Sequence, residues 1–162
     1  MVTVEFLRQL NGGPGVVLNV SSRSSYVTAP AMSSYQISKS AMNRLVSPPA
    51  QEKATPTHLP RLTEFVDKGY AEQGVVSVAF HPGGVPGTKV ADAAPEWLRK
   101  TFRDSPALPA STALYLTLPR AKYLGGRFIN AQWDMEELEA YRERIVEEDL
   151  LKMRVLGIDD RL

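Results

Sequence analysis

The sequence predicts an α/β fold, with a parallel sheet of about three strands and flanking helices. Three short, largely apolar segments have the length of strands, at residues 16–20, 75–80 and 127–130. The first two show little alternation of apolar and polar residues, which is typical of strands buried on both faces. Segments with helical spacing of apolar residues separate the strands. Helices that alternate with such strands favour parallel α/β layering.

Six segments around these strands carry apolar residues at helical spacing. They fall at residues 1–10, 35–45, 62–72, 95–102, 109–118 and 134–153. The turn 11–15, NGGPG, ends the first helix because Gly and Pro cannot propagate it, and Gly74 closes the third. The last segment is rich in Glu and Arg, which indicates a solvated face.

Length and composition exclude several classes of protein. The 162 residues suit one domain, and 19 Lys and Arg against 18 Asp and Glu give a net charge of +1. This charge offers no electrostatic basis for a nucleic-acid partner or an anionic membrane. Because there is no Cys and only two His, we predict no disulfide, no thiolate nucleophile and no metal site.

The sequence also predicts no membrane partner. No apolar run approaches the roughly 20 residues that a membrane span requires. The first ten residues, MVTVEFLRQL, carry Glu5 and Arg8 within their apolar stretch, which is unlike a secretory signal. We therefore expect a cytoplasmic protein.

Residues 46–61, VSPPAQEKATPTHLPR, form a Pro-rich insertion that interrupts a helical pattern. A helix interior cannot hold its four prolines. Removing the insertion joins AMNRL to LTEFVDKGYAEQG and produces one continuous amphipathic helix. One hypothesis is a retained intron or a gene-model error, because the codons of Val46 and Ser47 can spell the start of a eukaryotic intron. The alternative is a tolerated loop insertion.

The stretch from 16 to 44 carries the candidate chemistry. Tyr35 and Lys39 stand four apart, so they share one face of a helix. A nearby ammonium favours the phenolate and lowers the tyrosine pKa from its ordinary value of about 10. Ser22 follows the first strand, at the edge where open α/β sheets place reactive groups. An ordinary surface pair is the alternative, but the strand ending NVSS and the continuation SKSAMNRL favour a catalytic set.

On these motifs the sequence resembles the short-chain dehydrogenase/reductase family over almost its whole length. Residues 16–22 look like the family's fifth strand, and 35–39 match its catalytic motif. Residues 81–85, HPGGV, match the proline-glycine loop after its sixth strand. Residues 123–138 look like the last strand and tail of fungal members. The resemblance implies a partial Rossmann-like, doubly wound parallel sheet.

The resemblance also implies roles for the catalytic set Ser22, Tyr35 and Lys39. Tyr35 would exchange a proton with the substrate oxygen, and Ser22 would hydrogen-bond that oxygen. Lys39 would lower the pKa of Tyr35 and bind the ribose of a nicotinamide cofactor, NAD(P).

A cofactor-binding set follows from the same resemblance. The proline-glycine loop would line the nicotinamide pocket. The family's threonine falls at Gly87 here, and Thr88 stands one position later. The implied cofactor-binding residues are Tyr35, Lys39, Pro82, Gly83, Val85 and Thr88.

The family's glycine-rich cofactor turn has no counterpart in this sequence. Residues 11–15 lead from helix to strand, whereas a phosphate cradle needs a strand followed by a helix N-terminus. The resemblance therefore implies that residues 1–162 form a single truncated domain. This domain would be the C-terminal catalytic half, with the N-terminal cofactor-binding half missing.

Two functions follow as hypotheses. The first is an NAD(P)-dependent carbonyl reductase or alcohol dehydrogenase acting on a small-molecule carbonyl or alcohol, in fungal secondary metabolism if the tail indicates the host. The alternative is a non-catalytic truncated homologue, or a mis-spliced product, that is unable to bind cofactor. In either case exposed apolar surface predicts self-association.

Overall fold

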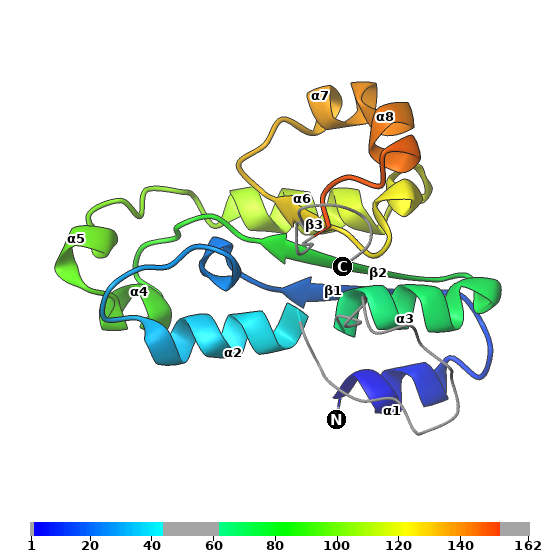
Figure 1. The fold of residues 1–162 in the computed structure, drawn as a ribbon, viewed down its shortest axis with the longest axis horizontal. Coiled ribbons are helices and arrows are strands. Elements are labelled where there is room, and N and C mark those ends of the chain that lie inside the picture. Colours follow the sequence, from blue (N-terminus) through cyan, green and yellow to red (C-terminus); the bar gives the residue numbers. More distant parts are fainter. Residues whose placement is uncertain (1, 44–61, 153–162) are drawn as a thin grey trace, which may run out of the picture.

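A three-stranded parallel sheet lies at the centre of the computed structural model, which describes residues 2–43 and 62–152. Its strands are β1 (Gly15–Val20), β2 (Val75–His81) and β3 (Phe128–Asn130), in the order β1-β2-β3 (Figure 1). The register pairs Val20 with Phe80, and Phe80 with Ile129. This arrangement confirms the predicted α/β fold and is consistent with part of a Rossmann-like sheet.

Helices cover both faces of the sheet. In Figure 1, α2 and α3 lie along one side of the strands, whereas α6, α7 and α8 lie along the other. The helices are α1 (Val2–Gln9), α2 (Ser33–Asn43), α3 (Leu62–Tyr70), α4 (Lys89–Ala93), α5 (Glu96–Arg99), α6 (Ala107–Thr117), α7 (Met135–Ala140) and α8 (Arg142–Glu147). Short 3₁₀ helices are η1 (Arg23–Ser25), η2 (Ala71–Gln73) and η3 (Pro119–Leu124).

Several details differ from the sequence prediction. Helix α2 begins at Ser33 rather than Tyr35, and α4 was not predicted. The charged C-terminal segment forms two helices, because the backbone turns at Tyr141 (φ −89°, ψ 10°). Apolar spacing cannot reveal this break, since both helices keep the same periodicity. The Pro-rich insertion 46–61 lies outside the described residues.

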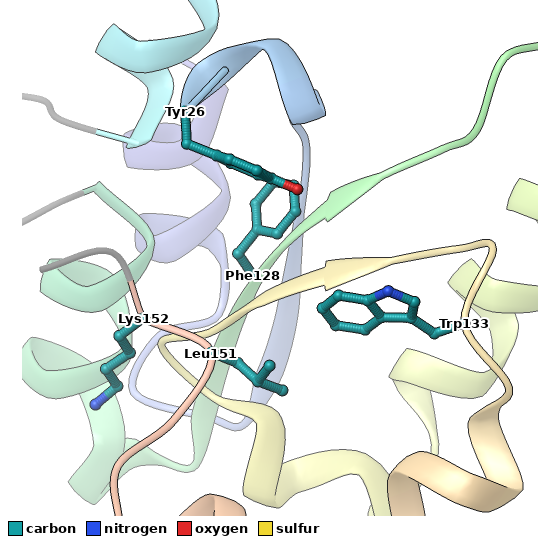
Figure 2. Close-up of a pocket in the computed structure, with 5 residues that line it drawn as sticks. All are labelled: Tyr26, Phe128, Trp133, Leu151 and Lys152. Atoms are coloured by element: carbon teal, nitrogen blue, oxygen red, sulfur yellow. The ribbon is translucent and has the colours of Figure 1, made fainter.

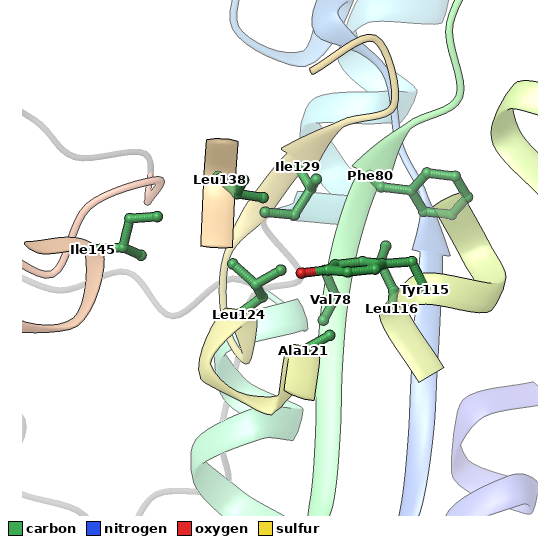
Figure 3. Close-up of a cluster of buried hydrophobic side chains, with 9 residues drawn as sticks. All are labelled: Val78, Phe80, Tyr115, Leu116, Ala121, Leu124, Ile129, Leu138 and Ile145. Carbon is green, nitrogen blue, oxygen red and sulfur yellow. The ribbon is translucent and has the colours of Figure 1, made fainter. Parts of the chain in front are cut away.

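The apolar core lies between the sheet and α6 (Figure 3). Val78 and Phe80 enter it from β2, because alternate residues of a strand share a face. The cluster consists of Val78, Phe80, Tyr115, Leu116, Ala121, Leu124, Ile129, Leu138 and Ile145. It therefore joins two strands to α6, η3, α7 and α8.

A buried polar network lies on the opposite face of the sheet, against α3. Asn19 Nδ2 donates hydrogen bonds to Thr63 Oγ1 and Ser77 Oγ, both at 3.2 Å. The Asp67 carboxylate accepts a bond from the Ser77 backbone N–H at 3.3 Å. Since a buried polar group without a partner is costly, these contacts fix α3 against β1 and β2.

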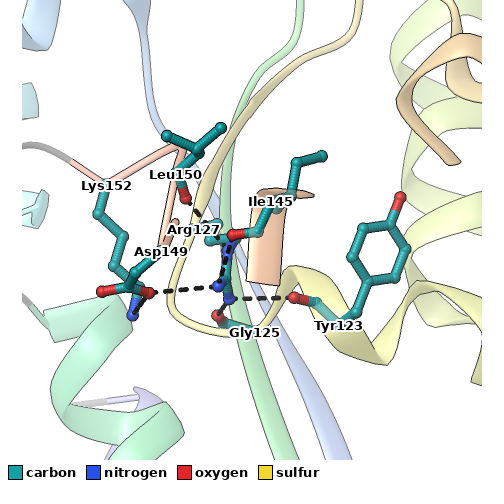
Figure 4. Close-up of polar contacts among 7 residues, drawn as sticks. All are labelled: Tyr123, Gly125, Arg127, Ile145, Asp149, Leu150 and Lys152. Carbon is teal, nitrogen blue, oxygen red and sulfur yellow. Dashed lines mark hydrogen bonds and ion pairs between the residues drawn. The ribbon is translucent and has the colours of Figure 1, made fainter. Parts of the chain in front are cut away.

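The buried guanidinium of Arg127 joins the C-terminal helices to β3 (Figure 4). Its Nη2 forms an ion pair with Asp149 at 3.2 Å. The three nitrogens of the guanidinium together donate to the backbone carbonyl oxygens of Tyr123, Gly125, Ile145 and Leu150, at 2.9 to 3.3 Å. One side chain therefore joins three segments, residues 123–125, 145 and 149–150, around the start of β3.

We predict that Arg127→Met lowers the free energy of unfolding by roughly 3 kcal/mol or more, because it leaves buried carbonyl oxygens without donors. Chemical denaturation of the variant and the wild type measures this change. Arg144→Met is the matched control, since Arg144 pairs with Glu148 on the surface at 2.8 Å. The control should leave stability nearly unchanged. Equal effects of the two substitutions would contradict the assigned role of Arg127.

Burial raises the pKa of Asp67 in the folded chain, and the Ser77 N–H and nearby Lys152 and Arg127 only partly offset this. The folded state then binds the proton more tightly than the unfolded state. The stability contributed by the protonated carboxyl is therefore lost as pH rises from about 4 through the raised pKa. As pH rises through this interval, we expect the unfolding free energy of the wild type to fall relative to that of the Asp67→Asn variant. Denaturation at a series of pH values tests this, and parallel curves would count against it.

Candidate active site

Ser22 lies where β1 ends, at the carboxyl edge of the sheet. It is 6% exposed and caps η1, where its Oγ accepts a hydrogen bond from the Ser24 N–H at 3.1 Å. A hydroxyl has one donor proton besides its acceptor lone pairs. Because the cap uses only a lone pair, the Ser22 O–H can donate to an oxygen placed at this edge.

Three hydrogen bonds fasten α2 to the end of β1 and to the loop that follows it. Gln36 Nε2 donates to the Val27 carbonyl oxygen at 2.7 Å. Lys39 Nζ and Ser40 Oγ donate to the carbonyl oxygens of residues 20 and 25, at 2.9 and 2.8 Å. The three donors stand at helical spacing, so they share one face of α2. This face is held against the segment that contains Ser22.

The structure brings Tyr35 and Lys39 together on this part of α2. Lys39 Nζ lies 5.7 Å from the centroid of the Tyr35 ring, and both side chains are half-buried. Burial lowers the pKa of Lys39. Helix α2 also contacts η1, the short helix that Ser22 caps. The three predicted catalytic residues therefore belong to two elements packed against each other.

The proline-glycine loop follows β2 at the same edge of the sheet. Gly83 has φ +86°, and a Cβ there would lie 2.6 Å from Asp104 Oδ2. A Cβ at Gly84 would lie 2.7 Å from Phe102 Cδ1. Both glycines are required here, because the chain from Phe102 to Asp104 packs directly on the loop.

Thr88 ends this loop and begins α4. Its Oγ1 accepts a hydrogen bond from the Ala91 N–H at 3.2 Å and donates to the Val85 carbonyl oxygen at 3.3 Å. The hydroxyl therefore fixes both the helix start and the loop before it.

Asp104 contacts the proline-glycine loop and Gln132 contacts Asp104, and no sequence pattern predicts either contact. Asp104 Oδ2 accepts hydrogen bonds from the Gly84 N–H at 2.6 Å and from Gln132 Nε2 at 2.8 Å. These residues are far apart in the chain and belong to no spaced motif. Only the folded chain brings them together.

His81, the last residue of β2, is half-buried next to the loop. Its Nδ1 has no hydrogen-bond partner among the described residues. Burial lowers the pKa of His81, Arg23 lowers it further, and Asp104 acts in the opposite direction. This environment favours the neutral imidazole.

Aromatic side chains line an open pocket beside β3 (Figure 2). Tyr26, from the loop after β1, meets Phe128 edge to face, with ring centroids 5.3 Å apart. The remaining lining residues are Trp133, Leu151 and Lys152. Trp97, by contrast, lies on α5 with 52% of its surface exposed.

Neither a metal centre nor a membrane span is present in the part of the chain that the structure describes. Within residues 2–43 and 62–152, no three acidic or histidine side chains gather in an arrangement that could hold an ion. None of the helices in these ranges combines the length and apolar character needed to cross a bilayer.

Known proteins resemble the chain over most of its length. It is 36% identical to the short chain dehydrogenase citE of Monascus ruber over 147 residues, which are 91% of this chain and 44% of that protein. It is 32% identical to the short chain dehydrogenase pgmD of Aspergillus terreus over 141 residues, 86% of this chain and 40% of the relative. The chain thus spans less than half the length of these relatives. No family model matches it.

Two glycines of the loop provide a matched test of its packing. Gly83→Ala and Gly87→Ala both place an alanine at positive φ, which costs roughly 1–2 kcal/mol. A Cβ at Gly87 meets no atom within 4 Å, whereas one at Gly83 meets the Asp104 carboxylate. We expect Gly83→Ala to lower the unfolding free energy by about 1–3 kcal/mol more than Gly87→Ala. Equal losses in chemical denaturation would show that the loop does not pack on Asp104.

Proposed function

We propose that this chain, a relative of the fungal short-chain dehydrogenases over part of their length, carries the proton-transfer residues of an NAD(P)-dependent oxidoreductase. The relatives support an oxidoreductase of the short-chain dehydrogenase type. The observation that supports the finer assignment is the packing of α2 against the Ser22 loop. This packing holds the face of α2 that carries Lys39 against the segment that contains Ser22, and Tyr35 lies one helical turn before Lys39.

In the proposed reaction Tyr35 acts as general acid and base. Its phenol gives a proton to the substrate oxygen when a carbonyl is reduced, and the phenolate takes the proton back when an alcohol is oxidised. Ser22 donates a hydrogen bond to the same oxygen and so stabilises the charge that develops there. Lys39 stabilises the phenolate by its positive charge. The substrate class is a small-molecule carbonyl or alcohol.

The residues present fit the nicotinamide end of the proposed cofactor. When bound, NAD(P) supplies or accepts the hydride. Lys39 would hold the ribose hydroxyls with an ammonium that its bond to the Val20 carbonyl orients. The backbone of Pro82, Gly83 and Val85 would line the nicotinamide. Thr88 would complete this set by holding the end of the loop through Val85.

We predict that Tyr35→Phe lowers turnover far more than cofactor affinity. The variant keeps the ring beside Lys39 and loses the hydroxyl that transfers the proton, so kcat should fall by about 100-fold or more. Because Tyr35 also belongs to the implied cofactor-binding set, the dissociation constants for NADH and NADPH, measured by fluorescence titration, should rise by the loss of one hydrogen bond at most, about tenfold. Tyr70→Phe, at the end of α3, is the control and should keep full turnover.

Cofactor titration of the wild type decides between this proposal and a non-catalytic homologue. Absence of NADH and NADPH binding at about millimolar concentration would favour the non-catalytic alternative. Binding together with full activity of Tyr35→Phe would retain an oxidoreductase but remove Tyr35 as its acid.

A further inference from the structure

Asp104 contacts the proline-glycine loop through both its side chain and its backbone. Its Oδ2 accepts the Gly84 N–H at 2.6 Å, and its own N–H donates to the Gly84 carbonyl oxygen at 3.0 Å. Both backbone polar groups of Gly84 are therefore bonded to one residue. Gly84 lies outside the strands, so its N–H and carbonyl group have no hydrogen-bond partner on a neighbouring strand. The two bonds to Asp104 supply those partners instead.

A third segment reaches the same carboxylate oxygen. Gln132 Nε2, in the turn after β3, donates to Asp104 Oδ2 at 2.8 Å. Hydrogen bonds to an ionised acceptor are shorter and stronger than neutral ones. Asp104 thus connects the end of β2 to the end of β3, and the side-chain amide of Gln132 limits where the carboxylate can lie.

Close packing limits the alternatives for this part of the loop. A Cβ at Gly83 would approach Asp104 Oδ2 to 2.6 Å, and a Cβ at Gly84 would approach Phe102 Cδ1 to 2.7 Å. The segment 102–104 therefore lies against the loop with no space for a side chain between them. The hydrogen bonds and this packing constrain the same two residues.

We propose that Asp104 is a positioning residue that holds the backbone of residues 82–85 in the shape that receives the nicotinamide, and that Gln132 acts through Asp104. This inference rests on the proposed function. A loop held in its bound shape before the ligand arrives loses less conformational freedom on binding. Asp104 touches neither the substrate nor the reacting atoms, so its effect is on cofactor affinity rather than on proton transfer.

Asp104→Ala tests the proposal with two readouts. Hydrogen exchange of the Gly84 amide, followed by NMR, should become about tenfold faster or more, because the amide loses its acceptor. The dissociation constant of NADPH should rise about tenfold, whereas kcat at saturating cofactor should change less than about twofold. Asp104→Asn keeps an acceptor oxygen for Gly84 and should restore most of both losses. Asp92→Ala, on the exposed side of α4, is the control and should alter neither readout.

A double-mutant cycle tests the role of Gln132. Gln132→Ala should weaken NADPH binding less than Asp104→Ala does, and the double variant should bind no more weakly than Asp104→Ala alone. Additive losses would show that Gln132 does not act through Asp104.

The remaining outcomes separate this inference from the proposed function. If the wild type binds NADPH and Asp104→Ala binds it equally well, the positioning role is overturned and the proposed function stands. If Gly84 exchange is unchanged in Asp104→Ala, the hydrogen bonds do not hold the loop and the inference fails on structural grounds. If the wild type binds no cofactor, the proposed function fails, and with it any role of Asp104 in cofactor binding.

Discussion

The parallel pairing of β1 with β2 is the constraint on which the candidate site depends. Because both strands run in the same direction, with Val20 opposite Phe80, the loops that follow them leave at one edge of the sheet. One loop carries Ser22 and leads into α2, and the other contains the proline-glycine motif. An antiparallel arrangement would send these two loops to opposite edges.

The two faces of the sheet fix this pairing in different ways. The face toward α6 buries apolar side chains such as Val78 and Phe80, whereas the face toward α3 buries Asn19 and Ser77 with their hydrogen bonds. A shift of one residue would move every side chain of a strand to the opposite face. It would place apolar groups against polar partners, so the mixed pattern specifies the register of β1 and β2.

Hydrogen bonds from side chains to the backbone shape the loops at the carboxyl edge. Lys39 and Ser40 donate to carbonyl oxygens of the segment around Ser22, and Asp104 accepts the N–H of Gly84. Near the start of β3, the guanidinium of Arg127 likewise donates to backbone carbonyl oxygens. Loops that lack ladder partners still need to satisfy their polar groups, and in these loops polar side chains supply the partners.

The sequence by itself determined the strands, most of the helices, the position of Ser22 after a strand and the shared helix face of Tyr35 and Lys39, because these follow from local periodicity and from a spacing of four on one helix. Only the tertiary structure decided that the C-terminal segment turns at Tyr141 and that Asp104 binds the loop at Gly84. The contact of Asp104 with Gly84 joins residues that are 20 positions apart in the chain. Such contacts leave no periodic signal, because each depends on where packing and backbone turns bring two distant segments together.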